Sequence, residues 1–398
     1  MLRNQSQQAA PLKPKTIILA GGGSGGHITP LLPLAHVLRR RCPKCRLIYI
    51  GLRGDKLDGV KERFGIFDQV FFVTSGKFRR YHDQSLLARL VDIKTIILNI
   101  KDFFKVLYGA FSARRLLKKL KPDVIFSKGG YVVVPIGLAA RSLHIPIITH
   151  DSDAEPGLAN RLVGRWAKIH TSGMPVEYYT DTYPAGTVKY VGVPTDERIR
   201  PVTPDLQIEY KKQLELPADS FVLLVAGGGL GSKTLNDKTL AIAPQLLKAD
   251  AKSHILHFTG SQHEMAVKQK YHQILSDEQL KRVKVVGFSD QFYKYSGAAD
   301  LVIARAGAST LAELAVAAKA CIIMPAAFLT GGHQLKNAQE LKIRQAAIIE
   351  DDKLSPQKLL KLTEQLRLNP KRRRELADNL GSMARPDAAD KLADLILA

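Results

Sequence analysis

The stretch KTIILAGGGSGGHITP, residues 15–30, decides the fold, because its pattern returns in the second half of the chain as FVLLVAGGGLGSKTLN, residues 221–236. In each copy an apolar run leads into the core AGGGxG, and a segment of helical character follows. A buried strand, a glycine turn and a helix form a ligand-binding βα unit, in which glycines let the backbone approach a ligand closely. The repeat therefore predicts two such units in one chain.

Further short apolar runs follow each copy, separated by helix-compatible sequence. They are RLIYIG, DVIFSKGG and PIITH in the first half, and HILHFTG, VKVVGF, DLVIARAG and ACIIMP in the second. Strands that alternate with helices predict parallel sheets with helices on both faces. We therefore predict an α/β fold of two doubly wound, Rossmann-like domains that face each other across a cleft. A chain of 398 residues is long enough for both.

Breaks in this pattern predict the domain boundaries. Residues 1–14 are polar and form a loose tail without the apolar segment of a secretion signal. The first domain spans residues 15–195 and the second spans residues 196–375, with the junction near Val193–Pro204. Residues 376–398 are predicted to form C-terminal helices that pack back on the first domain. The sequence has no long uncharged apolar run, so we expect no transmembrane helix.

Charge and cysteine content limit the chemistry further. A formal net charge of +22 indicates anionic partners: nucleic acid, an acidic lipid surface or phosphorylated substrates. The sequence shows no nucleic-acid-binding motif. Three cysteines make no disulfide framework, and the C-x-x-C at Cys42 and Cys45 lacks the further ligands of a zinc knuckle. We therefore expect a reducing cytoplasm, in which thiols stay free.

The first glycine loop, GGGSGG at residues 21–26, matches the G-x-G-x-x-G pattern of dinucleotide sites. Such a site also needs an acidic residue at the end of the second strand, and here RLIYI is followed by Gly51, Leu52 and Arg53. NAD(P) chemistry is therefore disfavoured. His27 follows the loop at the start of the predicted first helix. It could cap that helix or act as a general base, and the residue types leave both roles open.

Acidic and amide side chains mark the ends of other predicted strands. Glu313 falls in the first turns of the helix in ARAGASTLAEL, where it could bind a ribose diol or simply be favoured by the helix dipole. Gln334 is placed on the next strand-end loop, where an amide could contact a sugar. Asp151 and Asp153 form a D-x-D, a pattern that holds a metal-bound diphosphate in enzymes with a single nucleotide fold. With two such folds here, we predict no metal site.

Five motifs in order resemble the MurG family of GT-B glycosyltransferases (glycosyltransferase family 28): GGGSGGHITP, SKGGYVVVPIGLAA, THDSDAEPGLANR, ARAGASTLAEL and GGHQLKNA. The match runs from about residue 15 to the C-terminal helices. The resemblance implies an inverting enzyme that moves N-acetylglucosamine from UDP-N-acetylglucosamine to the muramyl C4 hydroxyl of lipid I, the undecaprenyl-diphosphate-linked N-acetylmuramyl-pentapeptide. The product is lipid II for peptidoglycan. It also implies a peripheral protein at the cytoplasmic face of the cell membrane, without a cofactor or a nucleic-acid partner.

The resemblance further implies which residues form the site. The catalytic residue would be His27, as the base for the acceptor hydroxyl. The substrate-binding residues would be Ser24, Gly25, Gly26, Gly129, Gly130, Tyr131, Asp153, Asn160, Gly229, Leu230, Gly231, Phe288, Ala308, Ser309, Thr310, Leu311, Ala312, Glu313 and Gln334. Three positions depart from the family pattern, one of them the Asp that usually precedes the family's Gln, which is missing from GGHQ. Gly229 replaces a serine that contacts diphosphate, and Arg198 is the available substitute for an arginine after G-x-P.

Residues 76–121 hold twelve Lys/Arg and three Asp/Glu. The apolar side chains among them are Phe78, Tyr81, Leu86, Leu87, Ile96, Ile97, Phe103, Phe104 and Phe111. Apolar residues among cations predict a helix pair that lies on an anionic membrane. The alternative is a pair of core-facing helices with solvated basic faces.

Two other functions stay open at this point. A related GT-B enzyme could glycosylate diacylglycerol or another lipid, although SKGGY and the segment DSDAEPGLAN favour the muramyl acceptor. The high charge alone would also allow a non-enzymatic nucleic-acid-binding protein.

Overall fold

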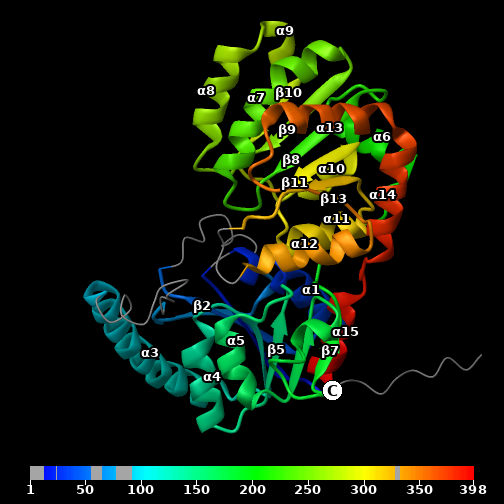
Figure 1. The fold of residues 1–398 in the computed structure, drawn as a ribbon. Helices are drawn as coiled ribbons and strands as arrows, with labels where there is room; N and C mark the ends of the chain where they lie inside the picture. Colours follow the sequence, from blue (N-terminus) through cyan, green and yellow to red (C-terminus); the bar gives the residue numbers. More distant parts are fainter. Residues whose placement is uncertain (1–12, 24, 55–64, 78–91, 328–331) are drawn as a thin grey trace, which may run out of the picture.

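The chain folds into two α/β domains stacked on each other and joined by a linker between β7 (Val188–Tyr190) and α6 (Pro204–Gln213) (Figure 1). The computed structural model describes residues 13–23, 25–54, 65–77, 92–327 and 332–398. Five of the residues named above lie outside these ranges: Ser24, Phe78, Tyr81, Leu86 and Leu87.

The first domain contains a seven-stranded parallel sheet in the order β3-β2-β1-β4-β5-β6-β7. Its strands are β1 (Thr16–Gly21), β2 (Arg46–Leu52), β3 (Gln69–Val73), β4 (Val124–Gly129), β5 (Ile147–Asp151), β6 (Ile169–Ser172) and β7 (Val188–Tyr190). The strand order reverses between β1 and β4. Open α/β sheets bind their ligands at such a switch point, outside the carboxyl ends of the strands.

The second domain repeats this winding in a six-stranded sheet of order β10-β9-β8-β11-β12-β13. Its strands are β8 (Phe221–Ala226), β9 (Ser253–Phe258), β10 (Val283–Val286), β11 (Leu301–Ala304), β12 (Cys321–Ile323) and β13 (Ile348–Ile349). Strands β8 and β11 take the places that β1 and β4 have in the first sheet. Each AGGGxG core therefore follows the first strand of a doubly wound sheet, and the predicted fold class is confirmed.

Helices cover both faces of each sheet (Figure 1). The first domain has α1 (Leu31–Arg41), α3 (Ile93–Leu120), α4 (Val133–Ser142) and α5 (Leu158–Val163). The second has α6 (Pro204–Gln213), α7 (Lys233–Ala249), α8 (Glu264–Ile274), α9 (Asp277–Leu280), α10 (Phe292–Ala298), α11 (Ala308–Val316), α12 (His333–Ile343), α13 (Pro356–Leu368) and α14 (Pro370–Ser382). Every residue of β8 is buried between these layers, which explains its continuous apolar run.

The last two helices belong to different domains. Helix α14 buries Leu376 and Leu380 in the cores of the second domain. The chain then crosses back, and α15 (Ala388–Leu397) packs on α1 of the first domain, where Leu392 and Ile396 are buried. We predicted that residues 376–398 pack on the first domain, and of these only α15 does so. The apolar face of α14 is covered by the second domain instead.

Cys42 and Cys45 form a disulfide at the end of α1. Both residues are buried, and their Cα atoms are 5.3 Å apart, within the range that a disulfide spans. The disulfide differs from the free thiols that we expected in a reducing cytoplasm. It forms because the turn after α1 brings the two cysteines together. Cys321 is a free, buried thiol.

Candidate active site

Two glycine turns meet at the carboxyl edge of the first sheet, after the neighbouring strands β1 and β4. Gly129 and Gly130 have φ angles of +97° and +81°, which residues with a Cβ rarely adopt. A Cβ on Gly130 would also stand 1.9 Å from the carbonyl oxygen of Gly22. Tyr131 covers the first turn, since a Cβ on Gly23 would lie 2.7 Å from its ring. Glycine is thus required where the two turns touch.

His27 lies between these two turns. It ends a single 3₁₀ turn, Gly25–His27, and α1 begins only at Leu31, after Pro30. The prediction that His27 stands at the start of the first helix is therefore wrong, because the glycine turn closes into a separate 3₁₀ turn before the chain enters α1.

The hydrogen bonding of His27 fixes its tautomer. Nδ1 lies 3.2 Å from the carbonyl oxygen of Lys128, and because a carbonyl only accepts, Nδ1 carries the proton and Nε2 keeps its lone pair. Burial, followed by the charge of Lys128, lowers the pKa of His27 to about 4, while Asp153 acts to raise it. The ring is therefore neutral near pH 7, and Nε2 is free to accept a proton.

Asp151 is a structural carboxylate. It accepts hydrogen bonds from Tyr183 Oη at 2.7 Å, from Asn160 Nδ2 at 3.0 Å and from the backbone N–H of Gly157 at 3.1 Å. Burial raises its pKa. Asn160, predicted to bind substrate, is 1% exposed, and its Oδ1 accepts a further hydrogen bond from Ser127 Oγ. In this structure Asn160 holds the loop after β5 rather than facing a ligand.

Asp153 instead connects the two domains. Its carboxylate accepts a hydrogen bond from Asn337 Nδ2 of α12 at 2.8 Å, and the backbone N–H of Ala154 donates to Asn337 Oδ1 at 2.9 Å. Lys336 forms an ion pair with Glu155 beside them. These contacts hold the carboxyl edges of the two sheets against each other. Asn337 lies within the motif GGHQLKNA, but the sequence assigns it no role, because that role depends on how the domains dock.

These contacts predict that activity survives chelation by EDTA. The carboxylates of Asp151 and Asp153 are already bonded to protein donors, so neither has to recruit a cation to become stable. Turnover measured before and after dialysis against EDTA should agree within error. Complete loss of activity that magnesium restores would place a metal at the D-x-D instead.

Glu313 lies in α11, which begins after Gly307. No described residue donates a hydrogen bond to its carboxylate. Burial, with a smaller contribution from Asp196, raises the pKa of Glu313 to about 7. An unpaired, half-buried carboxylate is available to accept hydrogen bonds from ligand hydroxyls. The preceding residues of α11 were also predicted to bind substrate; Ser309, Thr310 and Ala312 are partly exposed, whereas Ala308 and Leu311 are buried.

Gln334 lies in the first turn of α12 and not on a loop as predicted, because the helix begins at His333, directly after Gly332. Its Oε1 accepts a hydrogen bond from the backbone N–H of Ala326 at 2.9 Å. The amide is thereby oriented, and its Nε2 donors have no partner among the described residues. The charge of His333, the first residue of α12, also lowers the pKa of His27. The start of α12 therefore lies near His27 of the first domain.

The second glycine loop presents its tip to solvent. Leu230 is 77% exposed, and a Cβ on Gly229 would meet no atom within 4 Å. Gly231 lies instead against the carbonyl oxygen of Thr259, which a Cβ there would approach to 1.9 Å. Phe288, on the loop after β10, is half-exposed. The loop is therefore open to a ligand at Gly229 and closely packed at Gly231.

Arg198, the available substitute for the family's arginine, is bonded within the chain. Its guanidinium bonds both carboxylate oxygens of Asp196, at 2.9 and 2.7 Å, and lies 4.6 Å from the ring centroid of Tyr293. The side chain is therefore engaged within the linker and α10.

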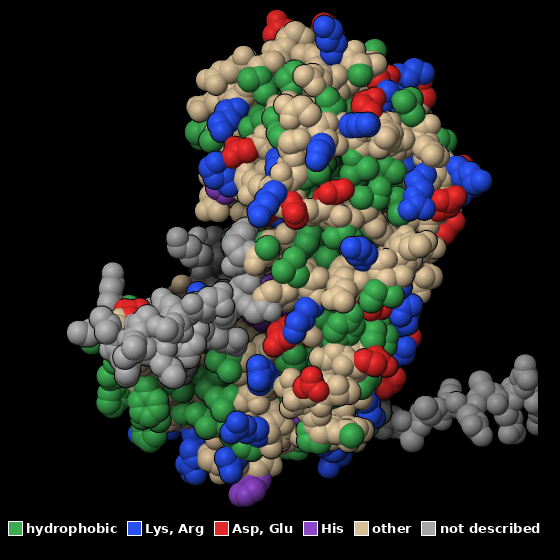
Figure 2. All heavy atoms as spheres, in the orientation of Figure 1, with side chains coloured by type: hydrophobic (Ala, Val, Ile, Leu, Met, Phe, Trp, Pro, Cys, Tyr) green, Lys and Arg blue, Asp and Glu red, His purple; other side chains and the backbone are tan. Residues whose placement is uncertain are grey.

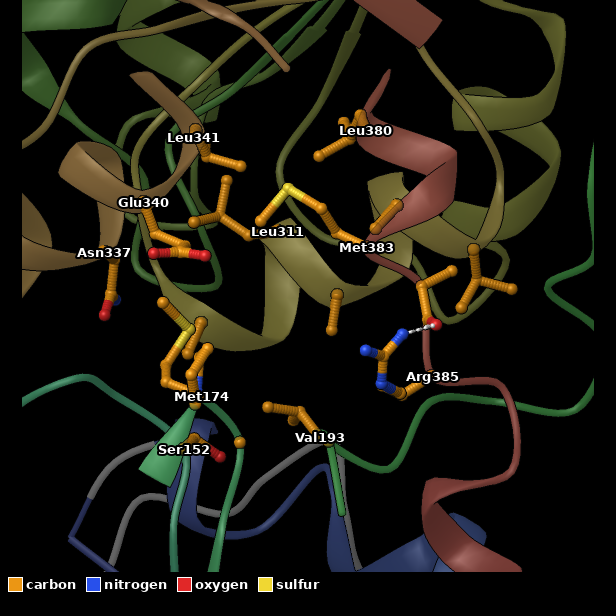
Figure 3. A pocket seen from close by; sticks show the side chains of 18 of the residues that line it. Ser152, Met174, Val193, Leu311, Asn337, Glu340, Leu341, Leu380, Met383 and Arg385 are labelled. Atoms are coloured by element: carbon orange, nitrogen blue, oxygen red, sulfur yellow. Dashed lines mark hydrogen bonds between the residues drawn. The ribbon is translucent and has the colours of Figure 1, made fainter. Parts of the chain in front are cut away.

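A separate cavity of about 80 Å³ lies between the domains where the chain crosses back (Figure 3). Met174 and Val193 line it from the first domain, and Leu311, Leu341 and Met383 line it from the other side. Of the described residues that line this cavity, none is His27, Glu313 or Gln334. Three of the predicted substrate-binding residues of α11, Ala308, Leu311 and Ala312, do line it, so the cavity adjoins the predicted site from behind α11 without including His27, Glu313 or Gln334.

Comparisons with known proteins find relatives over the whole chain. The glycosyltransferase family 28 N-terminal domain matches residues 17–171, and the C-terminal domain of the same family matches residues 222–392. The "UDP-N-acetylglucosamine--N-acetylmuramyl-(pentapeptide) pyrophosphoryl-undecaprenol N-acetylglucosamine transferase" of Halothermothrix orenii is 32% identical, over 96% of this chain and 98% of its own. The protein of that name from Citrifermentans bemidjiense is 28% identical, over 96% and 99%. The crystal structure of Acinetobacter baumannii MurG superposes with a TM-score of 0.69 at 28% identity, covering 96% of this chain and 99% of that one.

Proposed function

Because the chain belongs to glycosyltransferase family 28, we propose that it transfers N-acetylglucosamine from UDP-N-acetylglucosamine to the muramyl C4 hydroxyl of lipid I, making lipid II for peptidoglycan. The observation that carries this proposal is the setting of His27. Its Nε2 lone pair is available between two glycine turns, beside the domain that carries Glu313 and Gln334.

The second domain would hold the donor. The unpaired carboxylate of Glu313 can accept two hydrogen bonds from the ribose diol, and the Nε2 of Gln334 can donate to the sugar. The N-terminal turn of α11, residues 308–311, offers backbone N–H groups near the diphosphate. This placement supports stabilisation of the departing UDP by hydrogen bonds and the helix dipole.

The first domain would hold the acceptor and supply the base. His27 Nε2 takes the proton of the C4 hydroxyl as that oxygen bonds to the anomeric carbon, and the bond from the anomeric carbon to UDP breaks on the opposite face. The configuration inverts. The imidazolium that forms is stabilised by Asp153, whose charge already acts to raise the pKa of His27. UDP leaves with the electron pair of the broken bond.

We also propose that α3 rests on an anionic membrane surface. The helix lies along the outer edge of the first domain, and hydrophobic side chains gather there on the surface (Figures 1 and 2). Its exposed apolar residues are Ile97, Ile100, Phe103, Phe104, Leu107, Tyr108 and Phe111. Basic residues of the same helix flank them, at Lys101, Lys105, Arg114 and Arg115. Within the described ranges, no helix is long and apolar enough to cross a bilayer.

The membrane proposal predicts binding to vesicles that contain anionic lipid, and this binding should weaken as salt rises, because surface attraction is screened. The double substitution Phe104→Ser with Tyr108→Ser should reduce binding in a sedimentation assay. Leu368→Ser, at a 70% exposed leucine on α13, is the matched control and should leave it unchanged. Equal binding to neutral and anionic vesicles at every salt concentration would contradict the electrostatic part.

One assay tests the proposed reaction against the other functions that the sequence leaves open. Radiolabelled UDP-N-acetylglucosamine is offered with lipid I or with diacylglycerol, and RNA binding is measured separately. We expect label in lipid II only. Label in a glycosylated diacylglycerol, or tight RNA binding without any transfer, would reject the proposal.

A further inference from the structure

Lys128 is a buried lysine that the reaction as described does not use. It is the fifth residue of β4, whose other residues are apolar or small, and it is 3% exposed. Burying an ammonium group is costly unless it is paired, so a lysine in a central strand needs a reason to be there. Sequence reasoning missed it, although a cation inside VIFSKG was a visible signal.

The ammonium of Lys128 has no direct partner in the part of the chain that the structure describes. No hydrogen bond or ion pair reaches its Nζ from those residues. The nearest negative charges are Asp153 and Asp151, and the carboxylates of both are already bonded, to Asn337 and to Tyr183. Burial accordingly lowers the pKa of Lys128 to about 8.

The ammonium nevertheless reaches solvent. Among the described residues, only Glu364 Oε1 is a side-chain atom that is both fully enclosed and without a hydrogen-bond partner. Lys128 Nζ also has no partner among these residues, so it is not fully enclosed and keeps some contact with water. The positive charge of Lys128 lowers the pKa values of both His27 and His150. The ammonium therefore lies near these two histidines, at the carboxyl edge of the first sheet.

The backbone around Lys128 is shaped for an anion. Gly129 and Gly130 follow it with positive φ angles, and the glycine turn at Gly22 and Gly23 lies directly against them. Consecutive glycines in such conformations turn backbone N–H groups into a concave surface that binds phosphate oxygens. The charge of the unpaired Lys128 ammonium acts on His27, which lies between these turns, so it adds positive potential at the same place.

We propose that Lys128 binds a phosphate of the diphosphate in the lipid-linked acceptor, at the junction of the two glycine turns. This inference rests on the proposed function, because it takes the acceptor to be diphosphate-linked. The donor carries the same chemical group, and since Lys128 belongs to the first domain, whereas Glu313 and Gln334 belong to the second, we assign it to the acceptor.

The test is a kinetic comparison of Lys128→Gln with the wild type, using a short-chain, water-soluble lipid I analogue. Loss of a charge-assisted hydrogen bond should raise the acceptor KM by about tenfold or more. The donor KM should stay within about twofold, because the second domain is untouched. Lys128→Arg, which keeps the charge, should recover part of the loss. The melting temperature should not fall, since the substitution removes an unpaired buried charge.

Lys319→Gln is the matched control. Lys319 is also a buried lysine with a pKa lowered by burial, but its Nζ donates to the carbonyl oxygens of Gly297 and Ala299 at 2.8 and 2.9 Å. Its replacement should lower the melting temperature and leave both KM values unchanged. A donor KM that rises in Lys128→Gln while the acceptor KM does not would assign the lysine to UDP and overturn the proposal, as would two unchanged KM values.

A binding measurement separates this inference from the proposed function. Inorganic pyrophosphate is titrated by calorimetry into wild type and Lys128→Gln, with the donor site saturated by UDP. We expect weaker binding to the variant, and equal binding would overturn the role of Lys128 whatever the enzyme's substrate. Failure of the wild type to act on lipid I would instead reject the proposed function.

Discussion

Replacing His27 with alanine should lower turnover by about a hundredfold or more, the usual contribution of a general base. The affinity for UDP-N-acetylglucosamine should stay nearly intact, because the ring belongs to the first domain and the donor to the second. The hydrogen bond to the Lys128 carbonyl that presents Nε2 as an acceptor would be lost with the ring. Steady-state kinetics and donor calorimetry on the same preparation measure both effects.

His254 offers a matched control. Its Nδ1 also bonds a backbone carbonyl, that of Lys252, at 3.0 Å, but it lies at the start of β9, at the opposite end of the second sheet from the site. His254→Ala should keep normal turnover. A folded His27→Ala enzyme with near-normal turnover would reject the base, and a His27→Ala protein that fails to fold would return His27 to a structural role.

Replacing Glu313 with alanine should weaken donor binding by about 1.5–3 kcal/mol, the contribution of a hydrogen bond to a charged group. The pKa of Glu313 is raised to about 7, so the carboxyl group is protonated below that pH and ionised above it. Only the ionised form accepts hydrogen bonds from both ribose hydroxyls. Donor affinity in the wild type should therefore fall as pH decreases through about 7, and Glu313→Gln should remove this dependence.

Calorimetric titration of UDP-N-acetylglucosamine at several pH values measures both effects. Glu375→Ala, at an exposed residue paired with Arg372 on α14, is the control and should bind the donor normally. If Glu313→Ala binds UDP-N-acetylglucosamine as tightly as the wild type, Glu313 does not bind the ribose hydroxyls and the assignment is wrong.

Central strands are the part of the fold that the sequence predicts best. Strands such as β1 and β8 are buried on both faces, so they form continuous apolar runs that end in glycine turns. The strands that escaped prediction are β3, in which only one residue of QVFFV is buried, and the short strands β6, β7 and β13, with the sequences IHTS, VKY and II. Two to four residues are too few to show an apolar run, so these strands lack the pattern on which the prediction depends.

The site could be predicted where it depends on local sequence and not where it depends on docking. The glycine turns and Glu313 follow directly from strand ends, and the structure places them there. The bond between Asp153 and Asn337 joins residues far apart in the chain, and it exists only because the domains meet. The neutral state of His27 likewise depends on burial and on the charge of Lys128, which the local sequence around His27 does not reveal.

The central claim is inverting transfer to lipid I, and the structure of the product tests it most directly. UDP-N-acetylglucosamine is α-linked, so attack by the muramyl C4 hydroxyl opposite UDP should give a β-linked sugar on that oxygen. The measurement is the NMR coupling and connectivity of the disaccharide formed from a short-chain lipid I analogue. We predict a β-1,4 linkage, with one UDP released per sugar transferred. An α-linked product, a sugar on another oxygen, or release of free N-acetylglucosamine without transfer would contradict the account.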